Sequence, residues 1–188
     1  MIGEICKSPN LNKLKILKDE MKDSCKVYCE TGVLYAGSMI LQMESETPCH
    51  FIGIDLFTGY YGSSYDPHRK VDLTNHLEVA KQNINNNNPH KHSYELIKGD
   101  SKDKDICDKV KHKIDYLFID GDHTTMGVRY DFLNLKDKVN KGGLIVFDNY
   151  NDPNWIQVKP EADKLVEEYK NEFKIKLIEG HMLVLEKL

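Results

Sequence analysis

The sequence predicts an α/β fold in which a mostly parallel sheet carries helices on both faces. Short apolar runs, typical of buried strands, alternate along the chain with stretches of helical periodicity. Acidic residues or glycine follow several of these runs, as expected where parallel strands end at a ligand-binding edge. The last two runs are separated by Glu179-Gly180, a tight-hairpin signal that makes the final strand antiparallel.

Local patterns place the elements in order. Apolar spacing between Leu11 and Met21 predicts an N-terminal helix, and Pro160 is typical of the first turn of the last helix. The expected strands span residues 26–30, 50–55, 94–97, 116–119, 144–147, 173–178 and 181–186, and the other expected helices span 37–44, 71–84, 102–110, part of 121–141 and 160–171. We therefore expect a single domain over 1–188, with an N-terminal helical segment over 1–24.

Composition excludes several function classes. With 188 residues and a formal net charge of −4, the chain lacks the basic surface that nucleic acids or anionic membranes attract. Its apolar runs are too short to cross a bilayer, and residues 1–10 lack the apolar core of a signal peptide. Five cysteines without CxxC spacing are expected to be reduced thiols. We expect a cytoplasmic protein that binds neither nucleic acid nor membrane.

Oxygen-bearing side chains follow two strands of one strand–helix–strand unit. Asp120 ends the first strand, and Asp148 and Asn149 end the second. Parallel neighbours lie about 5 Å apart and open onto the same edge of the sheet, so the three side chains can converge. Hard oxygen ligands suit Mg²⁺ or Ca²⁺. The alternative is that these residues only cap loops and helices.

The first strand–turn–helix carries a second signal. Glu30 and Gly32 leave the strand, and Gly37 and Ser38 open the helix. Small residues let a backbone approach a ligand closely, but the spacing differs from the GxGxxG of a dinucleotide fold. An acidic group at this turn fits a cationic or amino-bearing ligand better than a pyrophosphate.

The next two strands also end in hydrogen-bonding groups. Asp55 lies some twenty residues beyond the glycine turn, where an acidic residue commonly binds ribose hydroxyls. Asp100 and Ser101 could bind an adenine edge, or Asp100 could cap the following helix.

In order and spacing, the chain from about Lys26 to Leu188 resembles the class I S-adenosylmethionine-dependent methyltransferases, whose Rossmann-like seven-stranded sheet also ends in an antiparallel hairpin. FIDGDHTTMGVRYDF and GGLIVFDN resemble the small-molecule O-methyltransferase branch with macrocin-type sugar methyltransferases. The metal pattern is similar to that of catechol O-methyltransferase, which binds Mg²⁺ through two aspartates and an asparagine. The resemblance implies a metal at Asp120, Asp148 and Asn149, and S-adenosyl-L-methionine at Glu30, Gly32, Gly37, Ser38, Asp55, Asp100, Ser101 and Asp120.

The same resemblance implies a catalytic base at His123, where the catechol enzymes carry lysine. Histidine can serve because its ordinary pKa lies near neutrality. Asp122 is the rival, as a further ligand or as the group that orients His123, and His123 could instead be a packing residue. The implied reaction is divalent-metal-assisted O-methylation of a small molecule: a sugar, a glycosylated metabolite or a catechol-like compound.

Two other functions stay open. A non-catalytic S-adenosylmethionine-binding or scaffold protein could share the fold. An N-methyltransferase is disfavoured because Asp148-Asn149-Tyr150 is not the Asn/Asp-Pro-Pro-aromatic motif used for amino groups on bases.

The aromatic, glycine-containing loop over 57–69 could close over the site or be a surface loop, and residues 151–155 could form the opposite wall. His90 and His92 follow four asparagines and are expected to be solvated rather than metal-binding. The short chain favours an open pocket, or one that a second subunit of a homo-oligomer completes.

Overall fold

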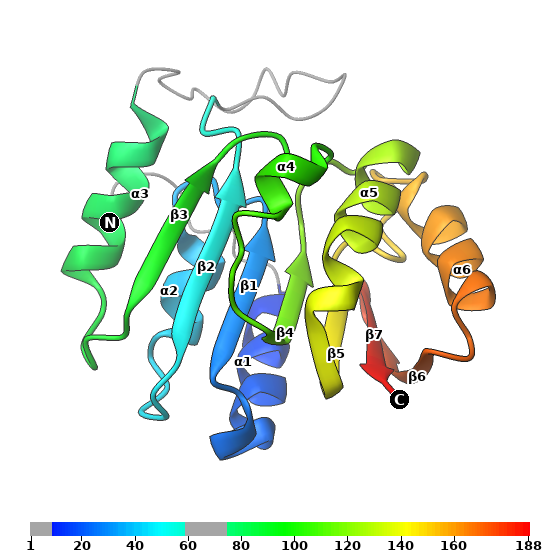
Figure 1. Ribbon diagram of the computed structural model, residues 1–188, viewed down its shortest axis with the longest axis horizontal. Coiled ribbons are helices and arrows are strands. Elements are labelled where there is room, and N and C mark those ends of the chain that lie inside the picture. Colours follow the sequence, from blue (N-terminus) through cyan, green and yellow to red (C-terminus); the bar gives the residue numbers. More distant parts are fainter. Residues whose placement is uncertain (1–8, 59–74) are drawn as a thin grey trace.

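A seven-stranded sheet forms the centre of the computed structural model, which describes residues 9–58 and 75–188 (Figure 1). The strand order is β3-β2-β1-β4-β5-β7-β6. Pairing is parallel from β3 to β5, and β7 runs antiparallel to both β5 and β6, which confirms the predicted sheet. The strands are β1 (Val27–Thr31), β2 (His50–Asp55), β3 (Tyr94–Lys98), β4 (Ile114–Ile119), β5 (Val139–Phe147), β6 (Phe173–Glu179) and β7 (Met182–Lys187).

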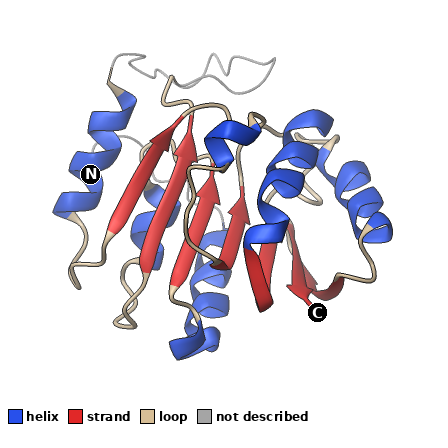
Figure 2. Ribbon diagram, viewed as in Figure 1, coloured by secondary structure: helices blue, strands red, loops and turns tan. Residues whose placement is uncertain are grey.

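Helices cover both faces of the sheet (Figure 2). One buried apolar cluster joins the sheet to α1, α2 and α3, and a second joins its other face to α4, α5 and α6. The helices are α1 (Pro9–Met21), α2 (Gly37–Gln42), α3 (His76–Asn86), α4 (Lys104–Cys107), α5 (Thr125–Leu135) and α6 (Val158–Glu168), with short 3-10 turns at Lys22–Ser24 and Lys136–Lys138. None of the helices in the described ranges is long and apolar enough to span a bilayer.

Some element boundaries differ from the sequence prediction. The helix expected over 102–110 is only α4, which ends at Cys107. It begins at Lys104, because Asp103 caps it by accepting a bond from the Asp105 amide. The last helix begins two residues before Pro160, which lies in the first turn, where a missing N–H is tolerated. The strand expected over 144–147 begins at Val139 and includes both glycines. The residues 71–74 of the expected third helix lie outside the described ranges.

Strand register brings the carboxyl ends of four strands together. Thr31 of β1 pairs with Ile54 of β2 and with Ile119 of β4, and Ile119 pairs with Phe147 of β5. The residues that follow these positions therefore leave the sheet side by side, as the carboxyl ends of parallel strands do. This edge holds the residues that the sequence marked as functional.

Candidate active site

Asp120 and Asp148 are fixed by backbone hydrogen bonds that extend the sheet past its last paired residues. The Asp120 amide donates to the Thr31 carbonyl at 3.1 Å, and the Asp148 amide donates to the Ile119 carbonyl at 3.1 Å. Asn149 then adopts a left-handed conformation with φ of 56°, a region that asparagine tolerates better than most residues. The two aspartates and the asparagine thus leave adjacent strands, as the sequence predicts.

His123 lies in the middle of this group. Its Nε2 atom is 3.2 Å from Asp120 Oδ1, and its ring stacks on Trp155 with centroids 4.4 Å apart. Burial of the ring tends to lower the His123 pKa. The hydrogen bond and charge of Asp120, the charge of Asp148 and the Asn149 side chain outweigh this effect, so the pKa of His123 is raised. All three predicted metal ligands therefore act on the same imidazole.

Asp122 is engaged elsewhere. Its Oδ2 accepts a 2.8 Å bond from Lys102 Nζ, and its Oδ1 accepts from the Thr124 amide at 3.0 Å. Although burial opposes ionisation, these two partners hold the Asp122 pKa below its ordinary value. Asp120, rather than Asp122, is the carboxylate that orients His123.

Gly32 permits the close approach of β1 and β4 at this edge. Its φ is +85°, and a Cβ atom built on it would lie 2.0 Å from the Asp120 carbonyl oxygen. Any side chain would therefore displace Asp120. Gly37 opens α2 directly after Ala36, which is itself left-handed at φ 66°.

Glu30 is buried beneath the glycine turn. Its Oε2 accepts from the Tyr28 hydroxyl at 2.7 Å and from Ser38 Oγ at 3.0 Å, while its Oε1 has no hydrogen-bond partner among the described residues. Burial raises the Glu30 pKa to about 8, despite the opposing bonds from Tyr28 and Ser38. A cationic ligand at Oε1 would favour the ionised carboxylate. Ser38 donates its hydroxyl hydrogen to Glu30, and its oxygen can still accept a bond.

Both carboxylate oxygens of Asp55 accept hydrogen bonds from backbone amides. Oδ2 accepts from the Leu34 amide at 2.8 Å and Oδ1 accepts from the Phe57 amide, yet burial still raises the Asp55 pKa. The carboxylate therefore already shapes the loops after β1 and β2. Each oxygen retains acceptor capacity for a further hydroxyl.

Asp100 closes a turn by accepting from the Lys102 amide at 2.9 Å. The alternative prediction that Asp100 caps the next helix is wrong, since Asp103 is the cap. The Ser101 carbonyl accepts a bond from Asn134 at 2.9 Å, which joins this loop to α5.

Sequence reasoning missed two supporting residues. Asp131 is fully buried on α5, and burial raises its pKa to about 6. It could have been found from its position between the buried Val128 and Phe132. Lys102 links two acidic residues, with Nζ 3.6 Å from Asp100 and 2.8 Å from Asp122. No local pattern marks that link.

Two further segments, over 57–69 and 151–155, are expected to flank the site. Residues 59–69, most of the expected lid over 57–69, lie outside the described ranges. In the expected wall over 151–155, Trp155 contacts His123.

His90 is exposed as expected. The prediction that His92 is solvated is wrong, because its ring is buried and its Nε2 lies 2.8 Å from the Ser45 carbonyl. The four cysteines within the described ranges are free and buried, in agreement with the prediction.

The chain is similar in sequence to known proteins over most of its length. A family model described as a methyltransferase domain matches residues 30–150. Over 143 residues the chain is 36% identical to an uncharacterized protein of Acanthamoeba polyphaga mimivirus, an alignment that covers 74% of this chain and 58% of that protein. The chain thus spans little more than half the length of this curated relative.

Solved structures share the fold at low identity. TomG, an O-methyltransferase from Streptomyces achromogenes in complex with S-adenosylmethionine, has 16% identity and a TM-score of 0.67, with 97% of this chain and 80% of that chain covered. A TDP-rhamnose 3'-O-methyltransferase of calicheamicin biosynthesis has 14% identity and a TM-score of 0.66, covering 94% and 78%. MycE, a methyltransferase of mycinamycin biosynthesis in complex with Mg and S-adenosylhomocysteine, has 15% identity and a TM-score of 0.60. The match covers 96% of this chain and 55% of that chain.

Proposed function

The chain belongs to the methyltransferase domain family, and from this membership we propose that it transfers the methyl group of S-adenosylmethionine to a hydroxyl of a small molecule. One observation carries the proposal. An oriented imidazole, His123, lies among three oxygen-bearing side chains where parallel strands end. That combination can remove a proton from a hydroxyl and hold a cation beside it.

The residues at the first two strand ends fit the cofactor. Glu30 has a buried oxygen without a partner in the described part of the chain, which suits the positively charged methionine portion. Gly32 keeps the adjacent turn free of side chain. Asp55 would accept from the ribose hydroxyls, and Asp100 with Ser101 would lie toward the adenine. When bound, the cofactor supplies a methyl group on a positively charged sulfur.

The donor set at the next two strand ends fits Mg²⁺ or another hard divalent cation. Asp120 and Asp148 offer carboxylates as ligands. Asn149 Nδ2 donates a hydrogen bond to Asp152 at 3.2 Å, so the amide oxygen is the Asn149 atom that could bind the cation. When bound there, the cation would lower the pKa of an acceptor hydroxyl. TomG and MycE, whose structures contain S-adenosylmethionine and Mg with S-adenosylhomocysteine respectively, support both assignments through their shared fold.

We propose that His123 takes the proton of the acceptor hydroxyl. With its Nε2–H donated to Asp120, the neutral ring carries its lone pair on Nδ1, which is buried and has no hydrogen-bond partner among the described residues. Trp155 restrains the ring by stacking and shields it from water. His123 would take the proton of the acceptor oxygen as that oxygen gains the methyl group of the bound cofactor. Positioning supplies much of the rate.

We propose a sugar or glycosylated metabolite as the acceptor, with a catechol-like compound as the other hydroxyl class. The TDP-rhamnose methyltransferase with the same fold supports the sugar. The net negative charge favours a small molecule over nucleic acid as the partner. The proposal also includes three further points. The chain forms a single domain over 1–188, a second subunit completes the pocket, and the protein is cytoplasmic.

The test incubates the protein with methyl-labelled S-adenosylmethionine, Mg²⁺ and a panel of sugar nucleotides, glycosides and catechols. We expect label on a hydroxyl oxygen, and loss of transfer in EDTA. Cofactor binding without transfer to any hydroxyl, and without an effect of metal, would favour a non-catalytic binding or scaffold protein. Label on nitrogen would favour an N-methyltransferase.

A further inference from the structure

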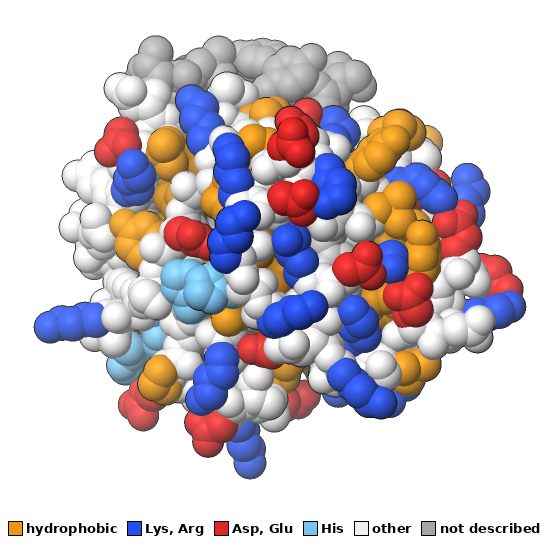
Figure 3. Space-filling view, in the orientation of Figure 1, with side chains coloured by type: hydrophobic (Ala, Val, Ile, Leu, Met, Phe, Trp, Pro, Cys, Tyr) orange, Lys and Arg blue, Asp and Glu red, His pale blue; other side chains and the backbone are white. Residues whose placement is uncertain are grey.

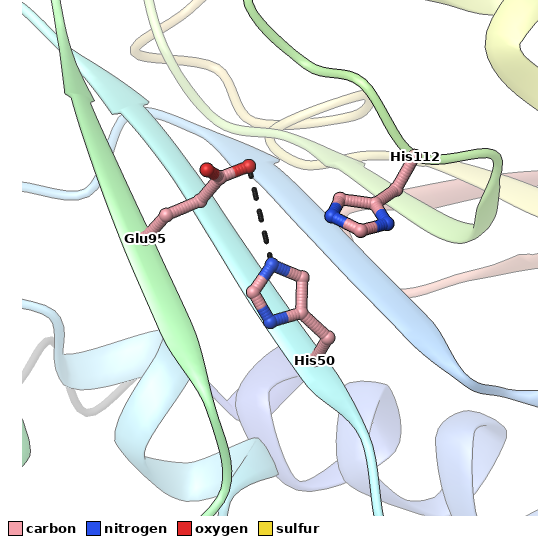
Figure 4. A group of neighbouring side chains, drawn as sticks. All are labelled: His50, Glu95 and His112. Carbon is pink, nitrogen blue, oxygen red and sulfur yellow. Dashed lines mark ion pairs between the residues drawn. The ribbon is translucent and has the colours of Figure 1, made fainter.

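Two histidines and a glutamate gather at the opposite end of the sheet from the candidate active site. His50 is the first residue of β2, Glu95 is the second residue of β3, and His112 lies in the connection that leads into β4. One ligand atom from each lies within 4.8 Å of the other two. In Figure 4 the His50 ring and the Glu95 carboxylate point toward one another, with the His112 ring beside them.

Strand register explains why the first two meet. Glu95 pairs with Ile52, and His50 lies two residues before Ile52, so His50 and Glu95 share one face of the sheet. His112 reaches the same place from a segment distant in sequence, and its ring centroid is 4.8 Å from that of His50. Three separate segments therefore supply the three groups.

The atoms between these side chains are unsatisfied. His50 Nε2 and Glu95 Oε1 lie 3.9 Å apart, too far for a hydrogen bond. Both atoms are buried, and neither has a hydrogen-bond partner within the described ranges. Buried polar atoms without partners are uncommon and costly, and an ion between them would satisfy both.

The surroundings suit a metal-bound imidazole. His50 Nδ1 is 2.8 Å from Ser93 Oγ, and such a contact to the second ring nitrogen fixes the orientation of metal-binding histidines. His112 is exposed, which leaves an open path from solvent. Histidine side chains are visible at the surface of the sheet face that carries α4 (Figure 3). The flanking Lys111 and Lys113 direct their ammonium groups to the carbonyls of Asp108 and Asp137.

We propose that His50, Glu95 and His112 bind one divalent transition-metal ion, with Zn²⁺ as the best match. Two imidazoles and one carboxylate are ligands that Zn²⁺ accepts, and water would complete a tetrahedral site. At metal–ligand bonds of about 2.0–2.1 Å, neighbouring tetrahedral ligand atoms lie about 3.4 Å apart. The 3.9 Å between His50 and Glu95 therefore has to close by only about half an ångström.

This site is separate from the candidate active site. β2 runs from His50 to Asp55, and at about 3.3 Å per residue its ends lie roughly 16 Å apart. The ion would tie β2, β3 and the connection before β4 at the end where the strands start. Binding an ion there would thus link three segments of the chain and stabilise the folded state.

The experiment titrates the full chain with Zn²⁺ against a chromophoric chelator and with Co²⁺ for its visible absorption, both in excess Mg²⁺ to occupy hard-oxygen sites. The variants are Glu95→Gln and His112→Ala, and the matched control is His90→Ala, which removes an exposed histidine outside the cluster. We expect one tight equivalent in the wild type and in His90→Ala. Loss of a ligand should weaken that binding at least about 10- to 100-fold, as even supporting residues do.

Thermal unfolding gives a second readout. Zn²⁺ should raise the Tm of the wild type and of His90→Ala, and should leave that of His112→Ala unchanged. Because His112 is exposed, this variant should fold, and its methyl transfer without Zn²⁺ should match the wild type. Absence of tight Zn²⁺ binding in the wild type, or equal binding in all four proteins, would overturn the proposal and leave the proposed methyl transfer unaffected.

Discussion

Asp120 and His123 hold each other at the end of β4, with Asp120 Oδ1 3.2 Å from His123 Nε2. A carboxylate can only accept, so the ring nitrogen facing it carries the proton. Stacking on Trp155 then fixes the plane of the ring. A histidine with a fixed tautomer and a fixed plane is prepared for proton transfer.

Replacing His123 tests its role as the base. We expect His123→Ala to lower kcat by about 10²–10⁴-fold, the usual value of positioned proton transfer, with cofactor affinity little changed. His123→Lys should recover part of the rate, since lysine occupies this place in the similar catechol enzymes. Asp122→Asn is the control, because Asp122 bonds to Lys102 and Thr124 instead. An unchanged kcat in His123→Ala would remove it from the mechanism.

Metal dependence can be measured as activity against Mg²⁺ concentration. We expect EDTA to abolish transfer and Mg²⁺ to restore it. Asp148→Asn keeps the shape of a mostly buried side chain but removes one ligand charge, so it should require at least about tenfold more Mg²⁺. Asp105→Asn, at an exposed aspartate on α4, should behave like the wild type. Full activity in EDTA would leave Asp120 and Asp148 as loop residues.

The sheet and the edge that carries the candidate site could be predicted because both depend on local patterns. Apolar runs mark the strands, and the residues that follow them, such as Asp120 and Asp148, must lie at one edge of a parallel sheet. Hydrogen-bond partners could not be predicted in this way. The bond from Lys102 to Asp122 joins the segment before α4 to the segment before α5, twenty residues away in sequence, and only the tertiary structure brings them together.

The burial of individual polar side chains could not be predicted from the sequence either. The sequence marks Glu30 as a ligand-binding residue but does not reveal its complete burial with Tyr28 and Ser38, which depends on how α2 packs on the sheet. His92 likewise looked solvated within a polar turn but is buried in contact with Ser45. Such side chains are placed by contacts between segments, which periodicity does not encode.

Asp55 should contribute to both cofactor binding and loop structure. We expect Asp55→Ala to weaken S-adenosylhomocysteine binding by about 1.5–3 kcal/mol, the range for hydrogen bonds to a charged group. The same change should lower the Tm of the ligand-free protein, because the Leu34 and Phe57 amides lose their acceptor. Calorimetry and thermal unfolding measure the two effects. Unchanged affinity together with a lowered Tm would restrict Asp55 to loop structure.

Glu30 should make stability depend on pH. Its pKa rises from an ordinary value of 4.5 to about 8 on folding, so between these values the unfolded chain is ionised while the folded carboxyl keeps its proton. Stability from this group is therefore greatest below pH 4.5, falls as the pH rises toward 8 and is constant above it. Glu30→Gln should remove this slope in denaturant unfolding of the ligand-free protein, and exposed Glu44→Gln should not. Since a cationic ligand favours ionised Glu30, S-adenosylmethionine should bind the wild type more tightly as the pH rises toward 8. Parallel pH curves for wild type and Glu30→Gln would show that the buried carboxyl does not titrate in this range.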